Sequence, residues 1–137
     1  MWWIYALLAA VFASLTAIFA KIGISGVNSD LATAIRTVIV LMLTWAIVLA
    51  RGELKGIGML SKHNILFLVL SGLATGLSWI FYFKALQLGE VSKVAPVDKL
   101  SVAFTIILSI LFLNENLTVK TVTGAVLIII GTVIIIL

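Results

Sequence analysis

Cysteine is absent from the 137 residues, and the chain holds one histidine, His63. Without thiols there is no disulfide framework, no cysteine nucleophile and no cysteine-ligated metal site. One histidine cannot complete a metal site by itself, and the sequence contains neither a glycine-rich phosphate loop nor a cluster of carboxylates. These absences argue against an enzyme and against a bound cofactor or metal.

Charge is also scarce. Charged residues make up 10% of the chain and apolar residues 64%, whereas soluble domains are nearer half apolar. These charges are too few to cover the surface of a water-soluble protein. Lipid must therefore be the solvent for most of the surface of this protein. The net charge is +4, but the nine lysines and arginines are scattered and no aromatic–basic patch accompanies them. They are typical of residues that flank membrane spans and do not indicate a nucleic-acid partner.

Long apolar runs fill the rest of the sequence. About 20 such residues are needed to cross the hydrocarbon of a bilayer, and a helix is required because an open strand in lipid leaves its backbone unpaired. The sequence therefore predicts an all-α, polytopic membrane protein with one domain, residues 1–137, in the cell (inner or plasma) membrane. The five predicted helices span residues of about 2–20, 31–50, 64–88, 95–113 and 119–137.

Polar residues mark the ends of these helices. Asn28, Ser29 and Asp30 can cap the second helix, and Thr118 can cap the fifth. Pro96 suits the first position of the fourth helix, where its missing N–H is not needed. Asp98 then falls in the first turn, where the helix dipole favours a carboxylate.

Small residues predict close helix contacts, because lipid supplies no hydrophobic drive between helices. Gly72 and Gly76 form a GxxxG step on the third helix, and Gly124 and Gly131 share a face of the fifth. Such steps occur in many polytopic proteins, so they indicate helix packing or a dimer contact rather than a particular activity.

Ionisable groups within spans are candidates for function. Arg36 lies inside the second helix, and Asp98 and Lys99 lie at the start of the fourth. For Arg36 and Lys99 structural pairing and a functional role carry equal weight, whereas Asp98 can serve as a dipole partner. Lys84, at the end of the third helix, can reach the interface along its aliphatic stem.

Aromatic residues form one face of the third helix, because Trp79, Tyr82 and Phe83 stand at i, i+3 and i+4. Ser78 adjoins this face. An interfacial aromatic belt would explain Tyr82, but Trp79 lies deeper than a belt needs. Trp79 is therefore the strongest candidate for substrate contact, followed by Tyr82, Ser78, Arg36, Lys99 and Asp98.

The stretch from Tyr82 to Thr118 resembles the EamA family of the drug/metabolite transporter superfamily. The matching features are Ala85-Leu86 followed by Gly89, the approach to Pro96, and a fourth helix that ends in Leu113-x-Glu115; Gly124 and Gly131 follow in the last helix. The resemblance covers the whole chain. It implies half of a ten-helix fold, in which an odd helix count turns the second five-helix unit upside down.

A single unit can rebuild such an inverted repeat only by pairing two copies in opposite orientations. The resemblance thus implies a transporter that moves a small metabolite or drug by alternating access, as an antiparallel homodimer with its substrate site between the protomers. Small multidrug resistance proteins, four-helix relatives, use a membrane-embedded glutamate in the first helix. This chain has no acidic residue there, which argues against the same cation/proton mechanism. A non-transporting membrane scaffold, or a flippase for a lipid-linked sugar, stays open.

The distribution of positive charge bears on orientation. The side of the membrane that holds the N-terminus carries four cations, Arg51, Lys55, Lys62 and Lys120. The other side carries five, Lys21, Arg36, Lys84, Lys93 and Lys99. The count becomes four against two if the three residues within or at the rim of spans are set aside. This weak bias favours dual orientation, with a fixed cytoplasmic N-terminus as the alternative.

Overall fold

The computed structural model describes residues 1–137 and contains helices only. The α-helices are α1 (Trp2–Gly23), α2 (Ser29–Ala50), α3 (Lys62–Leu88), α4 (Val91–Asp98), α5 (Ser101–Leu113) and α6 (Val119–Ile136), and a 3₁₀-helix, η1, spans Glu53–Met59. Five stretches are long and apolar enough to cross a membrane, with α4 and α5 together forming the fourth, Val91–Leu113. The all-α fold with five membrane spans is therefore confirmed.

The chain divides into two compact units. Unit 1 consists of residues 1–18 and 88–137, and unit 2 of residues 19–87. Helix α1 runs through the boundary between them, so its last turn belongs to unit 2.

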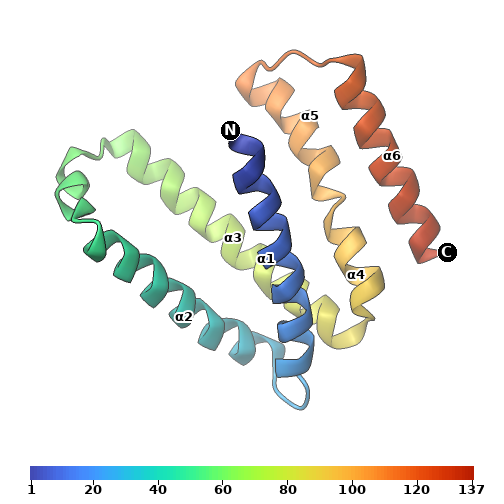
Figure 1. Ribbon diagram of the computed structural model, residues 1–137, viewed down its shortest axis with the longest axis horizontal. Helices are drawn as coiled ribbons and strands as arrows, with labels where there is room; N and C mark the ends of the chain where they lie inside the picture. The colour runs from blue at the N-terminus through green and yellow to red at the C-terminus, as the bar shows by residue number, and fades with distance from the viewer. The chain divides into compact units, whose positions relative to one another are not determined.

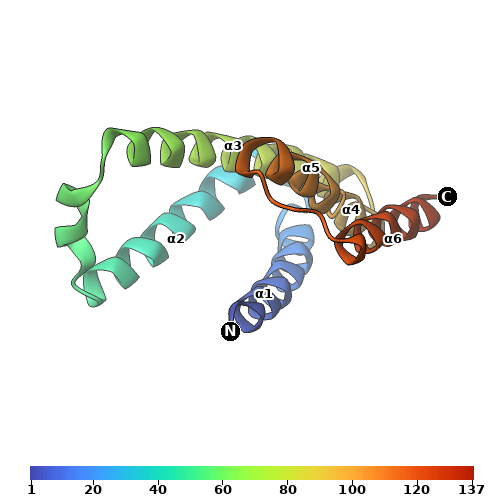
Figure 2. The ribbon, with the colours of Figure 1, turned by 90° about the horizontal axis from the view of Figure 1, so that it is seen from above.

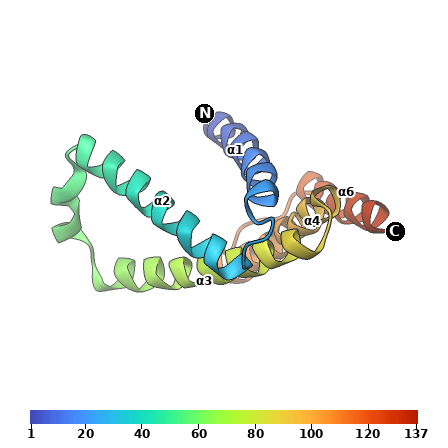
Figure 3. The same ribbon diagram turned by 90° about the horizontal axis from the view of Figure 1, so that it is seen from below.

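In unit 2, helices α2 and α3 meet at one end and diverge toward η1 (Figures 1, 2 and 3). Asn28 caps α2 as predicted, because its side-chain oxygen accepts hydrogen bonds from the backbone N–H groups of Asp30 and Leu31. The buried residues of unit 2 all lie near the meeting end; they are Ala20, Ile24, Ser29, Thr33, Phe83 and Leu86. This end is therefore where the unit has its core.

Two side chains form hydrogen bonds that stabilise the meeting end of α2 and α3. Lys21 Nζ, in the last turn of α1, donates to the carbonyl oxygen of Leu86 at 2.6 Å. Gln87 Nε2 donates to the carbonyl oxygen of Val27 at 2.8 Å. A cation is favoured where the C-terminal carbonyls of a helix lack partners, so Lys21 satisfies one such group at the end of α3.

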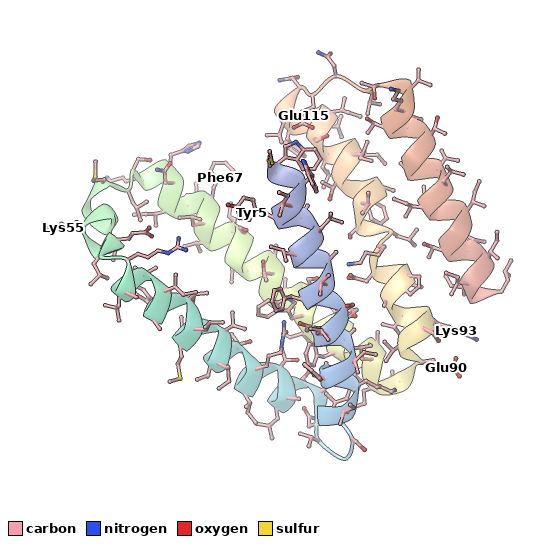
Figure 4. All side chains as sticks on the ribbon, in the orientation of Figure 1. Tyr5, Lys55, Phe67, Glu90, Lys93 and Glu115 are labelled. Atoms are coloured by element: carbon pink, nitrogen blue, oxygen red, sulfur yellow. The ribbon has the colours of Figure 1, made fainter.

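In unit 1, α6 runs back along α4 and α5 and contacts both (Figure 1). Asn114 ends α5 in the left-handed conformation, with φ of 53°, which asparagine tolerates better than most residues. Thr118 caps α6 as predicted, accepting from the N–H of Thr121 at 3.2 Å. Figure 4 shows Glu115 in the connection between α5 and α6.

The fourth span differs from the prediction. It begins at Val91 rather than near Pro96, so Pro96 lies inside α4 and Asp98 is the last residue of that helix instead of a first-turn residue. Glu90 provides the N-cap position, and its carbonyl accepts from the N–H groups of Lys93 and Val94 (Figure 4). The prediction was wrong because it used the preference of proline for the first helical position, whereas the chain resumes a helix within two residues of the end of α3.

The span is also broken, at Lys99 and Leu100. The N–H of Leu100 bonds to Val97 O instead of Pro96 O, the partner that a continuous α-helix would use. Pro96 O accepts from the N–H of Lys99 at 3.0 Å and lies 3.3 Å from the hydroxyl of Thr132 on α6. That hydroxyl also bonds to Ile128 O at 2.8 Å. The Pro96 carbonyl, which would accept from Leu100 in a continuous α-helix, thus accepts from the N–H of Lys99 and is approached by the hydroxyl of Thr132.

Candidate functional site

Arg36 stacks on the aromatic face of α3. Its guanidinium carbon lies 4.2 Å from the centroid of the Trp79 ring and 4.9 Å from that of Phe83. Both distances are within the roughly 6 Å range of a cation–π interaction, which is worth about 0.5–2 kcal/mol. The structure therefore brings together two residues that the sequence identified separately, Arg36 and Trp79.

Helix periodicity places these three side chains. Trp79 and Phe83 are four residues apart, so they lie one above the other on α3. Thr33, one turn before Arg36 on α2, is buried, and Phe83 is only 2% exposed. The packed end of unit 2 therefore fixes Arg36 against the aromatic face.

Arg36 is embedded in its span. It is the eighth residue of α2, about 10 Å along the helix from its first residue at ~1.5 Å per residue. Trp79 lies nine residues before the end of α3, about 13 Å by the same rise. Both therefore lie about two turns from the nearer ends of their helices, whereas aromatic belts and snorkelling cations are typical of span ends.

One nitrogen of the Arg36 guanidinium lacks a hydrogen-bond partner. Its Nη1 atom is shielded from solvent and has no hydrogen-bond partner, and Arg36 forms no ion pair with a carboxylate. A buried donor without a partner costs about 1–3 kcal/mol, and more when it is charged. Unit 2 thus holds a partly buried cation that contacts the rings of Trp79 and Phe83 and interacts electrostatically with Tyr82.

Of the other candidate residues on α3, Tyr82 lies beside this contact. The Tyr82 ring is half-buried and lies 6.3 Å from the Phe83 ring in an edge-to-face arrangement. Ser78 and Lys84 are exposed. The structure therefore places Tyr82 beside the Arg36 cluster, which we define as Arg36, Trp79 and Phe83, while Ser78 and Lys84 lie on open surface.

A second polar group lies in unit 1, at the break in the fourth span. Asp98 and Lys99 form an ion pair of 3.3 Å, and both side chains are substantially exposed, by 37% and 57%. Because the span begins at Val91, Asp98 lies about 10 Å along it at ~1.5 Å per residue. The break thus carries a charge pair well inside the span, deeper than a first-turn position would place it.

The predicted packing glycines have no neighbours within the chain. A side-chain carbon built at Gly72, Gly76, Gly124 or Gly131 would meet nothing within 4 Å. The helical steps are therefore present, but no other segment of the same chain occupies them.

Two hollows lie elsewhere in unit 2. One of about 450 Å³ is lined by α2 and η1 residues, including Trp45 and Glu53. Another of about 400 Å³ lies at the start of α3 beside His63 and Phe67, whose rings are 4.7 Å apart. Neither contains a predicted substrate residue. Lys55 is at the same end, on η1 (Figure 4).

Three contributions were missed by sequence reasoning. Phe83 was included in the aromatic face but not as a partner of Arg36, although its i+4 spacing from Trp79 was the available signal. Lys21 and Thr132 act on carbonyls 65 and 36 residues away along the chain. Nothing local in the sequence indicates such contacts.

The EamA-like transporter family matches residues 1–137, the entire chain. A Sinorhizobium protein named as an uncharacterized transporter in the cobO 3' region is 50% identical over 123 residues, which cover 90% of this chain and 87% of that relative. An uncharacterized protein of Methanocaldococcus jannaschii is 32% identical over 128 residues, covering 93% of this chain and 90% of the relative. No solved structure matches the chain. The family match, the transporter-named relative and the five apolar spans lead to one conclusion: the chain belongs to the EamA-like transporter family and is a multi-pass membrane transporter.

Proposed function

We propose that this protein moves a small solute across the membrane by alternating access, as an antiparallel homodimer with the substrate site between its two copies. The observation that carries the proposal is the broken fourth span, α4–α5, with the Asp98–Lys99 pair at the break. Discontinuous helices are a recurring feature of transporter substrate sites, where unwound backbone and helix ends face the solute.

The homodimer is supported by the helix count. Five spans leave the chain ends on opposite sides of the membrane, so a second five-helix unit of the same kind would be inverted if it followed in one chain. The two relatives are matched over nearly their whole lengths, so they too are about one unit long. A second copy in the opposite orientation supplies the inverted half that alternating access requires.

Solute flux tests the proposal. The purified protein in liposomes is expected to give saturable counterflow with at least one member of a radiolabelled panel of amino acids, sugars, sugar phosphates and carboxylic acids. Empty liposomes and liposomes with heat-denatured protein are the controls. Flux no greater than in the controls across the panel, with a foreign subunit co-purifying in stoichiometric amount, would support a scaffold instead.

The glycines of α6 test the dimer. A side-chain carbon at Gly124 or Gly131 meets nothing within 4 Å, so isoleucine at both positions should leave the fold of the single copy intact. If the second copy packs there, the added bulk overpacks the contact by about 1–3 kcal/mol and weakens dimerisation about tenfold. Energy transfer between labelled copies in detergent measures this change.

A matched control lies on the other side of the same helix. Val126 and Val133 are also seven residues apart and are each 46% exposed, and they stand two residues, or about 200°, beyond the glycines. Phenylalanine at both positions should leave dimerisation unchanged. Equal effects of the two double substitutions, or none from either, would mean that the glycine face contacts lipid.

A further inference from the structure

The charge of the Arg36 cluster is unbalanced. An ionised side chain within a span normally pairs with an opposite charge or faces a polar cavity. Arg36 has neither a carboxylate nor a hydrogen-bond acceptor for its Nη1. Its contacts with Trp79 and Phe83 involve aromatic rings, which stabilise the charge but accept no conventional N–H hydrogen bond.

The donor geometry of arginine determines what can complete the site. The guanidinium is planar, and its N–H groups point outward in its plane as a fork that fits two oxygens of a carboxylate or phosphate. Arg36 is only partly buried, so an oxyanion can approach the exposed part of the guanidinium. A small displacement of the side chain would then let Nη1, which is shielded from solvent and has no partner, donate to the second oxygen of the anion.

The surrounding charges favour an anion as well. At this end of unit 2 the charged residues are Lys21, Arg36 and Lys84 against Asp30, three cations and one carboxylate. Asp30 is exposed in the first turn of α2, six residues before Arg36 and therefore about 120° from it around the helix. A cationic solute would meet net repulsion here.

We propose that the Arg36 cluster binds the carboxylate or phosphate group of a small organic anion, which makes organic anions the substrate class of the transporter. This assignment rests on the transport function proposed above. A lipid headgroup presents the same phosphate chemistry, and the experiment distinguishes it from a soluble anion.

Fluorescence of Trp79 provides a direct readout. The chain has four tryptophans, so Trp2→Phe, Trp3→Phe and Trp45→Phe leave Trp79 alone, beside Arg36. In dodecyl maltoside at constant ionic strength, titration with benzoate and with phenyl phosphate should give a saturable change in emission for at least one of them. Benzamide, the neutral counterpart of benzoate, should give none. Arg36→Gln should weaken the binding at least tenfold, and Arg36→Lys should weaken it several-fold because the fork is lost.

Lys84→Gln is the matched control. It removes one positive charge from an exposed site on α3, so it tests the general effect of net charge and should weaken the binding less than twofold. If Arg36→Gln fails to fold, chemical protection replaces it. Arg36 and Arg51 are the two arginines, so Arg51→Lys leaves Arg36 as the sole target of phenylglyoxal, and benzoate or phenyl phosphate should slow its modification at least threefold while benzamide does not.

The outcomes separate the site from the transport function. Binding of benzamide equal to that of benzoate, equal losses in Lys84→Gln and Arg36→Gln, or no saturable binding of any anion overturns the proposal. If short-chain phosphatidic acid saturates the signal and the soluble probes do not, the oxyanion site stands but holds a lipid headgroup, and the assignment of substrate class fails. Anion binding without flux in liposomes would support the site and refute the transport mechanism. Flux of neutral solutes without anion binding would support the transport mechanism and refute the anion site.

Discussion

A tag fused to the C-terminus is expected to be found on both sides of the membrane in comparable amounts. Orientation follows the lysines and arginines near the ends of spans, and here they divide five to four, or two to four when the embedded ones are left out. Neither division gives a strong bias. Accessibility of the tag to an impermeant reagent in intact and in lysed cells measures the two populations.

Added charge should convert dual orientation into a single one. Glu53→Lys with Gly58→Lys adds positive charge at η1, and Glu90→Lys with Ser92→Lys adds it at the opposite end of α3. Each double variant alone should insert one way and lose flux by at least tenfold, and the pair together should restore it. A wild-type tag confined to one side in every cell, with flux intact and no second subunit present, would contradict the antiparallel dimer.

Pro96→Ala is expected to raise the melting temperature and to lower flux at least tenfold. Alanine supplies the N–H that proline lacks and removes its clash with the preceding turn, a change worth up to about 3 kcal/mol in a helix interior. The new N–H faces Ser92 O, in the turn that precedes the break at Lys99 and Leu100, so α4 should become stiffer on that side of the break. Melting in detergent and counterflow in liposomes measure the two effects on one preparation.

Val97→Ala is the control for Pro96→Ala. Val97 is the next residue of α4 and is 41% exposed, so its truncation changes neither the backbone nor a buried contact. It should alter melting and flux little. If Pro96→Ala transports at the wild-type rate, the flexibility of α4 beside the break has no part in the transport cycle.

The spans and their caps could be predicted because they depend on local properties. Apolar length decides whether a helix crosses lipid, and Asn28 and Thr118 cap their helices through N–H groups only two or three residues away. The aromatic face of α3 followed from the helical period alone. These features need no knowledge of how the chain packs.

The features that could not be predicted depend on how the helices pack against one another. The sequence could not show that Arg36 meets Trp79, because 43 residues separate them and the rotation of α2 about its axis is fixed by the burial of Thr33 and Ser29. Nor could it show the break at Lys99, since one acceptor that would keep the helix continuous is also approached by Thr132 from α6. The glycine pattern was visible, but the empty space beside each glycine was not.

The 3₁₀ geometry of η1 gives the α2–α3 hairpin a reserve of chain length. Its seven residues span about 14 Å at the 3₁₀ rise of ~2.0 Å per residue, and the same residues when extended reach about 23 Å. Hydrogen bonds in a 3₁₀-helix are poorly aligned, so this segment lengthens more easily than the α-helices that it joins. The diverging ends of α2 and α3 can therefore separate by up to about 9 Å more. The hydrogen bonds of Lys21 and Gln87 keep the two helices together at the meeting end, which acts as the hinge.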